Sequence, residues 1–194
     1  MRAKGRNAPE SEPMSLQLTA PPATEPVSLA QAKAWLRVES GNDEDDLITA
    51  LIQAARVRCE WHTGRAFVTQ GWTLWLDGIG DGLVSVPLPP LASVSAVTLY
   101  DGDDAARVLD SSDYRADLAG GRILFDAPLT DLRPLNGVAI AFTAGYGGAL
   151  MVPAAITSAI LQTMAWLYEH RGGDAAPLPD GALVLLAPWR VARL

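Results

Sequence analysis

Hydrophobic positions recur at helical spacing in three parts of the chain, and an alternating pattern fills the interval between the second and the third. Ser28 and Gln31 form the signature of a capping box, so a first helix is predicted from Ser28 to about Val38. The third periodic part lies between Pro153, a typical first helical residue, and Gly172, a typical stop. It is apolar on nearly every side and is predicted to be the central helix of a small bundle.

The second periodic part, roughly Glu44 to Thr63, is apolar on two sides, and Gly64 follows it as a C-terminal cap. The first apolar face consists of Leu47, Ile48, Leu51, Ile52, Ala55 and Cys59. A second apolar face consists of Ala50, Ala54, Val57 and Trp61. Only a narrow polar stripe remains, made of Asp46, Thr49, Gln53, Arg56 and Glu60. Because a surface helix of a monomer normally has a wide polar face, the second apolar face is predicted to meet a neighbouring subunit.

Alternation replaces helical spacing from Trp72 to about Tyr146 and predicts β-structure. Turn residues at Asp101-Gly102 and Gly120-Gly121 favour short antiparallel connections. Prolines 87, 89 and 90 predict an edge or a crossing loop. The expected strands are Trp72 to Asp77, Leu83 to Val86, Val94 to Tyr100, Arg122 to Phe125 and Val138 to Thr143.

The fold class predicted from these patterns is α+β, a small helical bundle with an inserted antiparallel β domain. The bundle takes residues 27–71 and 150–177, and the β insertion takes residues 72–149. Residues 1–26 hold five prolines among small and polar residues, which predicts a flexible N-terminal arm, and either Met1 or Met14 can be the start. Residues 178–194 form a C-terminal tail.

Charge and composition narrow the range of functions that the chain could have. The 194 residues include 15 basic and 22 acidic side chains, a net charge of −7, so the basic surplus typical of nucleic-acid binding is missing. A single cysteine, Cys59, cannot form an intrachain disulfide, which fits assembly in the cytoplasm. The longest apolar stretch, around Ala154 to Tyr168, is shorter than the ~20 residues of a membrane span. No membrane segment is predicted.

Candidate chemistry is sparse. The acidic cluster Asp43, Glu44, Asp45 and Asp46 could ligate a metal in a nuclease or hydrolase, but consecutive helical residues diverge, and acids at a helix start favour the helix dipole. His62 and His170 stand outside any zinc-type spacing. Gly145 to Gly148 lacks the Lys-Ser/Thr of a phosphate-binding loop. No catalytic, metal-binding or cofactor-binding residue is therefore predicted, and the chain is not expected to be an enzyme.

The C-terminal tail contrasts with the rest of the chain, because no acidic side chain follows Asp180. Trp and Arg are the types most often found as interface hot spots. The tail either folds back on its own bundle or docks on a partner, and the docking residues are predicted to be Leu183, Leu185, Leu186, Trp189, Arg190 and Arg193.

The order of short motifs points to a family. Ala34-Trp35-Leu36-Arg37-Val38 precedes the acidic gap, and Thr63-Gly64-Arg65 ends the long helix. Later come Pro87-Leu88-Pro89-Pro90-Leu91, Phe142-Thr143-Ala144-Gly145-Tyr146-Gly147 and Leu185-Leu186-Ala187-Pro188-Trp189-Arg190. From about Leu16 to Arg193 the chain resembles the head-tail connector (adaptor) proteins of long-tailed phages and gene transfer agents, the type with a β insertion in a helical domain.

The resemblance implies a structural subunit of a ring, commonly dodecameric, in the neck of a virion or gene transfer agent particle assembled in the host cytoplasm. Its implied partners are the portal protein, a stopper or other neck protein, and further copies of itself, while DNA passes through the channel without specific binding. Asp43 to Asp46 are then candidates to face the channel, where negative charge repels DNA. Other readings are a neck stopper or tail-completion protein, a metal-dependent nuclease or hydrolase, and an oligomeric protein that binds small ligands.

Overall fold

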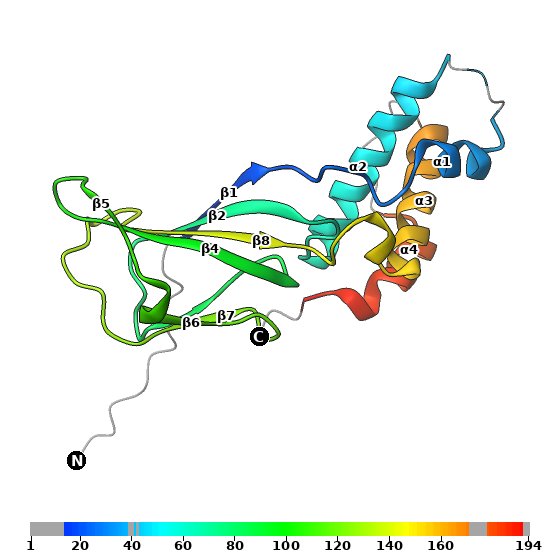
Figure 1. Ribbon diagram of the computed structural model, residues 1–194. Helices are drawn as coiled ribbons and strands as arrows, with labels where there is room; N and C mark the ends of the chain where they lie inside the picture. Colours follow the sequence, from blue (N-terminus) through cyan, green and yellow to red (C-terminus); the bar gives the residue numbers. More distant parts are fainter. Residues whose placement is uncertain (1–13, 39–40, 42, 171–177, 192–194) are drawn as a thin grey trace, which may run out of the picture.

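A computed structural model describes residues 14–38, 41, 43–170 and 178–191 (Figure 1). Helices gather at one end of the molecule and the β-strands extend from them toward the other end. Each half has its own hydrophobic core, one built from helices and one from sheets. This arrangement confirms the predicted α+β class.

The helical half is built from four α-helices and two short 3-10 helices in the described part of the chain. They are α1 (Leu29–Leu36), α2 (Asp45–Thr63), α3 (Ala154–Glu169), α4 (Asp180–Leu186), η2 (Ala149–Met151) and η3 (Ala187–Trp189). The capping box forms as predicted, with Gln31 N donating to Ser28 Oγ at 3.2 Å and Ser28 N to Gln31 Oε1 at 2.9 Å. Helix α1 ends before Val38 because Arg37 takes a left-handed conformation, and Gly64 caps α2 in the same way.

Helix α3 is the centre of this bundle, as its all-round apolar sequence predicted. It packs against α1, α2 and α4. Ile156, Ile160 and Met164 are fully buried there, and they share one core with Ile48 and Ile52 of α2.

Two antiparallel sheets make up the other half. A five-stranded sheet has the order β1-β2-β8-β4-β5, and a three-stranded sheet has the order β3-β7-β6. A 3-10 turn, η1 (Ser111–Asp113), leads into β6. The strands are β1 (Met14–Ala20), β2 (Gln70–Leu76), β3 (Leu83–Ser85), β4 (Leu91–Tyr100), β5 (Ala106–Val108), β6 (Tyr114–Asp117), β7 (Arg122–Phe125) and β8 (Val138–Ala144).

The inner faces of the two sheets share one core. Strand β7 shows the alternation that places it there, since Ile123 and Phe125 are buried whereas Arg122 and Leu124 face outward. Strand β8 lies in the middle of the larger sheet and is apolar on both faces, which explains its continuous hydrophobic run.

The predicted flexible arm is wrong for residues 14–20. Met14–Ala20 form strand β1, which pairs antiparallel with β2 from Met14 opposite Leu76 to Ala20 opposite Gly71. The strand was missed because it is held by backbone pairing at a sheet edge, and its side chains are mostly exposed. Pro26 and Val27 are also buried. Residues 1–13 of the predicted arm lie outside the described residues.

The prediction of a separate C-terminal tail is wrong for its first part. Leu178, Ala182 and Leu186 are buried in the helical core, because α4 packs along α3. Two alternatives were predicted for this segment, folding back on its own bundle or docking on a partner. Helix α4 folds back on the bundle. Gly181 allows the close approach, since a Cβ there would lie 2.3 Å from Gln162 Oε1.

Candidate functional site

The outward side of α2 carries the second apolar face predicted from the sequence. Each member lies two positions after a core residue, which is about 200° around the helix, so the two faces are opposite. The outward members, Ala50, Ala54, Val57 and Trp61, are all exposed and are called the α2 stripe here. Trp61 is 85% exposed and Val57 41%. An indole this accessible is unusual on a water-facing surface and is typical of a contact surface.

The acidic residues at the start of α2 do not share one environment. Glu44 accepts a 2.6 Å hydrogen bond from the Tyr168 hydroxyl of α3, and Asp45 forms an ion pair with Lys33 of α1. These contacts hold the helix ends together. Asp43 and Asp46 are exposed. Two of the four candidates thus have partners inside the chain. For the exposed Asp43 and Asp46, the channel-facing role stays a prediction.

The C-terminal segment divides into a buried and an accessible part. Leu186 is fully buried, and Leu183, Leu185 and Trp189 pack partly against the helical core. The Trp189 ring meets the Tyr146 ring edge-on at 6.0 Å, and the Trp189 carbonyl accepts a hydrogen bond from Arg65 Nε. Only Arg190 of the predicted docking residues in the described part of the chain is exposed. Arg193 lies outside the described residues.

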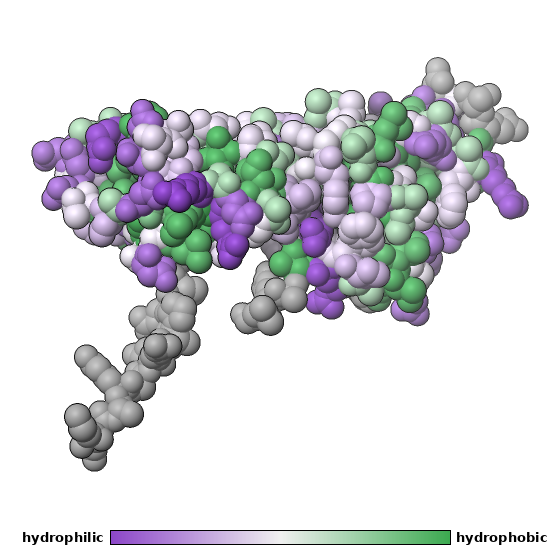
Figure 2. Space-filling model, turned by 60° about the horizontal axis from the view of Figure 1, so that its bottom comes forward, coloured by the Kyte–Doolittle hydropathy of each residue, from purple (hydrophilic) through white to green (hydrophobic). Residues whose placement is uncertain are grey.

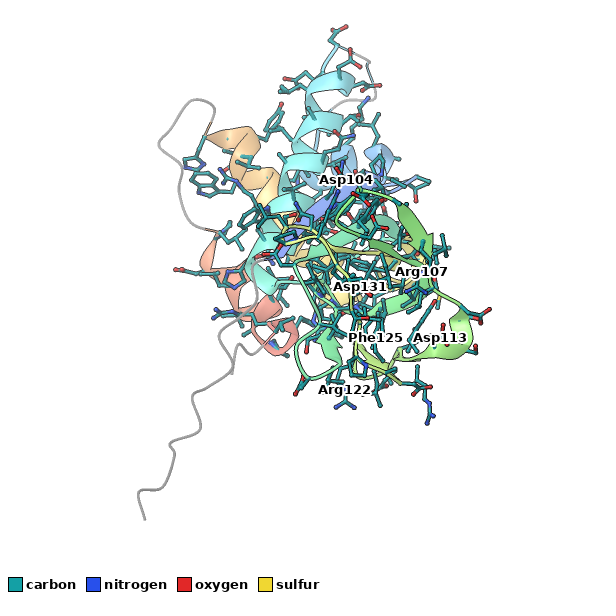
Figure 3. All side chains as sticks on the ribbon, turned by 90° about the vertical axis from the view of Figure 1, so that its left-hand side faces the viewer. Asp104, Arg107, Asp113, Arg122, Phe125 and Asp131 are labelled. Carbon is teal, nitrogen blue, oxygen red and sulfur yellow. The ribbon has the colours of Figure 1, made fainter. Side chains whose placement is uncertain are left out.

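The far end of the sheets is charged with both signs. Figure 3 looks onto this end and shows Asp104, Arg107, Asp113, Arg122 and Asp131 from different loops and strands. Several aspartates there stabilise turns and caps. Asp101 accepts from the N–H of Ala105 at 2.9 Å, and Asp110 accepts from that of Ser112 at 2.9 Å. Hydrogen bonds from Ser112 lower the pKa of the exposed Asp110 carboxyl.

The outer face of the small sheet carries an open, mostly apolar groove. Leu83 and Leu124 line it as a cross-strand pair. Arg115 and Arg122 line it as well, and Arg122 is held by Asp117 at 2.6 Å. Figure 2 shows this side of the molecule with hydrophobic patches between hydrophilic ones.

Comparison with known proteins identifies the class. A family model described as "Phage gp6-like head-tail connector protein" matches residues 26–100, which span α1, α2 and β2 to β4. A chain in the neck of an empty gene transfer agent (GTA) particle, computed with C6 symmetry, is 26% identical. That alignment covers 93% of this chain and 97% of the other, with a TM-score of 0.79. The family-model match and the likeness to the neck chain support a head-tail connector protein of the phage or GTA type.

Two further solved structures agree across almost the whole length of the connector. A chain of a native GTA virion is 25% identical with a TM-score of 0.74, covering 92% of this chain and 96% of the other. A chain in the neck of a native GTA particle, computed with C12 symmetry, is 27% identical with a TM-score of 0.69, covering 92% and 97%. A search of curated proteins finds no match. The connector is a structural protein of a phage-type particle, not an enzyme.

Cys59 and His170 have structural positions in the connector. Cys59 is fully buried in the helical core, and burial raises the pKa of its thiol to about 11, as is typical of a structural cysteine. His170 stacks on Trp166 with ring centroids 4.5 Å apart. In the described residues no group of three or more metal-type side chains could hold an ion. None of the described helices has the length and hydropathy to span a bilayer.

Sequence reasoning missed one exposed feature of the connector. Leu150 and Met151 of η2 follow the Gly145 to Gly148 turn and project into solvent, with exposed fractions of 100% and 67%. They are called the η2 tip here. The available signal was an apolar pair placed directly between a glycine-rich turn and Pro153, where a packed helix start needs no such side chains.

Proposed function

We propose that this connector forms a ring beneath the portal, joins the capsid to the tail and continues the DNA channel. The observation that carries the proposal is the likeness to chains in GTA necks computed with C6 and C12 symmetry. Because the likeness covers more than nine-tenths of this chain, both the helical half and the sheets support a ring subunit.

The α2 stripe is the proposed lateral interface. In an isolated subunit its Val57 and Trp61 contact water. Covering a large apolar side chain contributes about 1.5–3 kcal/mol, so one Trp per contact is a substantial part of a weak interface. Interface cores are enriched in Trp and depleted of charge, and the stripe matches both tendencies.

The portal-docking surface is proposed at the accessible part of the C-terminal segment. Val184 is 73% exposed on the side of α4 opposite the buried Ala182 and Leu186, and Arg190 follows Trp189. The fixed position of Trp189 beside Tyr146 supports this role, since a pre-organised anchor loses less entropy on binding.

The net charge of −7 per subunit supports passage of DNA without binding, and Asp43 and Asp46 are the accessible candidates on α2 for the channel wall. The same charge disfavours association of free subunits. We therefore expect the isolated connector to be monomeric or weakly associated and to form its ring chiefly on the portal.

The test is to mix the purified connector with the purified portal ring from the same particle and to measure the mass of the product by native mass spectrometry. The expected product carries a symmetric set of connector copies, six or twelve per portal. Failure to bind the portal, or a tight ring without portal at nanomolar concentration, contradicts the proposal. Binding only to a portal that already carries another neck protein would identify a stopper instead.

A further inference from the structure

The backbone that carries the η2 tip is held in one conformation by the fold. Gly145 has a φ of +126°, and a Cβ there would lie 2.5 Å from the backbone carbonyl of Val68, so only glycine fits. The turn is tied to the segment before β2, with Tyr146 N donating to Phe67 O at 2.9 Å and Thr69 N to Gly147 O at 2.9 Å. Its backbone is therefore fixed where it presents Leu150 and Met151.

Leu150 and Met151 are held in contact with water, and covering them with another apolar surface is energetically favourable. The turn is anchored on its far side too, because Val152 is buried in the helical core directly after Met151. The two side chains cannot turn inward without breaking these contacts. An exposed, pre-organised apolar contact is the usual form of an interface anchor, since little entropy is lost when it is covered.

The α2 stripe offers a surface of matching chemistry. Its members are spaced by four, three and four residues, the spacing of positions that pack against another element along one helix face. Ala50 and Ala54 have small side chains, so a partner's side chains can approach the helix backbone closely there, and Val57 and Trp61 follow toward the C-terminal end of α2. The stripe is about 16 Å long at 1.5 Å per residue, long enough to receive two neighbouring side chains.

Ring symmetry links these two surfaces. In a cyclic ring every subunit uses two different patches, one for each neighbour, because the interface is heterologous. The chains to which this connector is similar lie in assemblies computed with sixfold and twelvefold symmetry. We infer that Leu150 and Met151 of one subunit pack onto Ala50, Ala54 and Val57 of the next copy around the ring. This inference rests on the proposed function and names the two faces that close the ring.

Cross-linking tests the contact directly. Cys59 is buried and poorly reactive, so cysteines introduced at the surface are the reactive thiols. The double variant Ala54→Cys with Leu150→Cys, assembled on the portal and treated with a short bis-maleimide, is expected to give a ladder of multimers up to the full ring. Each single variant gives no ladder, because it has only one reactive site per subunit. A portal-bound ring of normal mass without a ladder overturns the inference and leaves the proposed ring intact.

A charge exchange gives an independent test. Leu150→Lys alone and Ala54→Glu alone are each expected to reduce ring occupancy on the portal at least tenfold. The double variant is expected to recover most of it, because the introduced ammonium group of one copy then faces the introduced carboxylate of the next. Val108→Lys is the control for an exposed apolar residue outside this contact and outside the proposed docking surface, on β5, and it should leave ring occupancy unchanged. If the double variant is as defective as the singles while all three fold normally, the two faces do not meet.

Discussion

Arg56 Nε donates a 2.7 Å hydrogen bond to Glu25 Oε2, across 31 positions of sequence. Its Nη1 also donates to Glu60 at 2.6 Å, and Glu60 Oε1 accepts from Phe67 N and Gln70 Nε2, both at 2.8 Å. The network therefore joins the segment before α1, the middle of α2 and the start of β2. Burial raises the pKa of the Glu60 carboxyl, and Arg56 opposes that shift. This polar joint fixes the sheets relative to the helices.

Replacing Arg56 by Met should destabilise the protein by about 3–5 kcal/mol, since two largely buried carboxylates lose their counter-ion. Urea unfolding of the variant and the parent measures the difference. Arg107→Met is the control, because Arg107 is exposed on β5 and should change stability by less than about 0.5 kcal/mol. Equal effects at both positions would show that the joint adds nothing beyond surface charge.

Gly145→Ala should destabilise the fold by about 2–3 kcal/mol, because the new Cβ meets the Val68 backbone at a positive φ. Gly148→Ala is the matched control three residues on. Nothing lies within 4 Å of its Cβ position and its φ is −70°, so its stability should stay equal or rise slightly. Thermal unfolding of both variants distinguishes them, and similar losses at both sites would argue against a rigid turn.

Elements with strong local signals were predictable. The capping pair Ser28 and Gln31, the cap Gly64 and the apolar α3 each fix their own segment through short-range chemistry, and the structure reproduces them. The outward α2 stripe followed from periodicity alone, since two apolar faces on one helix are visible in sequence. Its partner stays a prediction.

Long-range features were not predictable. Strand β1 depends on pairing with β2, more than fifty residues later, and its own side chains bury little. The sequence pattern placed Arg56 in a polar surface stripe. In the structure Arg56 is only 8% exposed, because Glu25 of the segment before α1 lies against it and forms an ion pair with it. The segment that forms helix α4 was predicted to be a separate tail. The helix that it mainly packs against, α3, precedes it in the sequence and is separated from it by a Gly/Pro-rich loop. In each case the stabilising partner is distant in sequence.

The two sides of α4 should separate folding from docking. Leu186→Ala removes a fully buried side chain and should cost about 2–5 kcal/mol of stability. Val184→Asp changes the exposed side and should leave the urea midpoint nearly unchanged while weakening portal attachment at least tenfold. Sizing of portal mixtures measures attachment. Portal binding by Val184→Asp at the parent level would move the docking surface away from α4.

The last prediction concerns pH and the contact between α2 and the C-terminal segment. Partial burial and the nearby Arg190 charge lower the pKa of His62 below its ordinary 6.5. The unfolded chain then takes up this proton first as the pH falls. The stability contribution of neutral His62 is therefore complete above about pH 6.5 and is lost as the pH drops through the lower folded pKa.

An NMR titration of the His62 ring should give a midpoint below 6.5, and Arg190→Ala should raise it, because one of the two causes is removed. His62→Gln should make the urea midpoint less dependent on pH between about 7.5 and 5, by a small amount since the ring is partly exposed. The backbone bond from Val191 N to Thr63 O at 2.8 Å places the C-terminal segment beside the ring, so its amide protection should weaken in the same pH range. A His62 titration midpoint at or above 6.5 that does not change in the Arg190→Ala variant would show that the two charges do not interact. The C-terminal segment would then be positioned by packing alone.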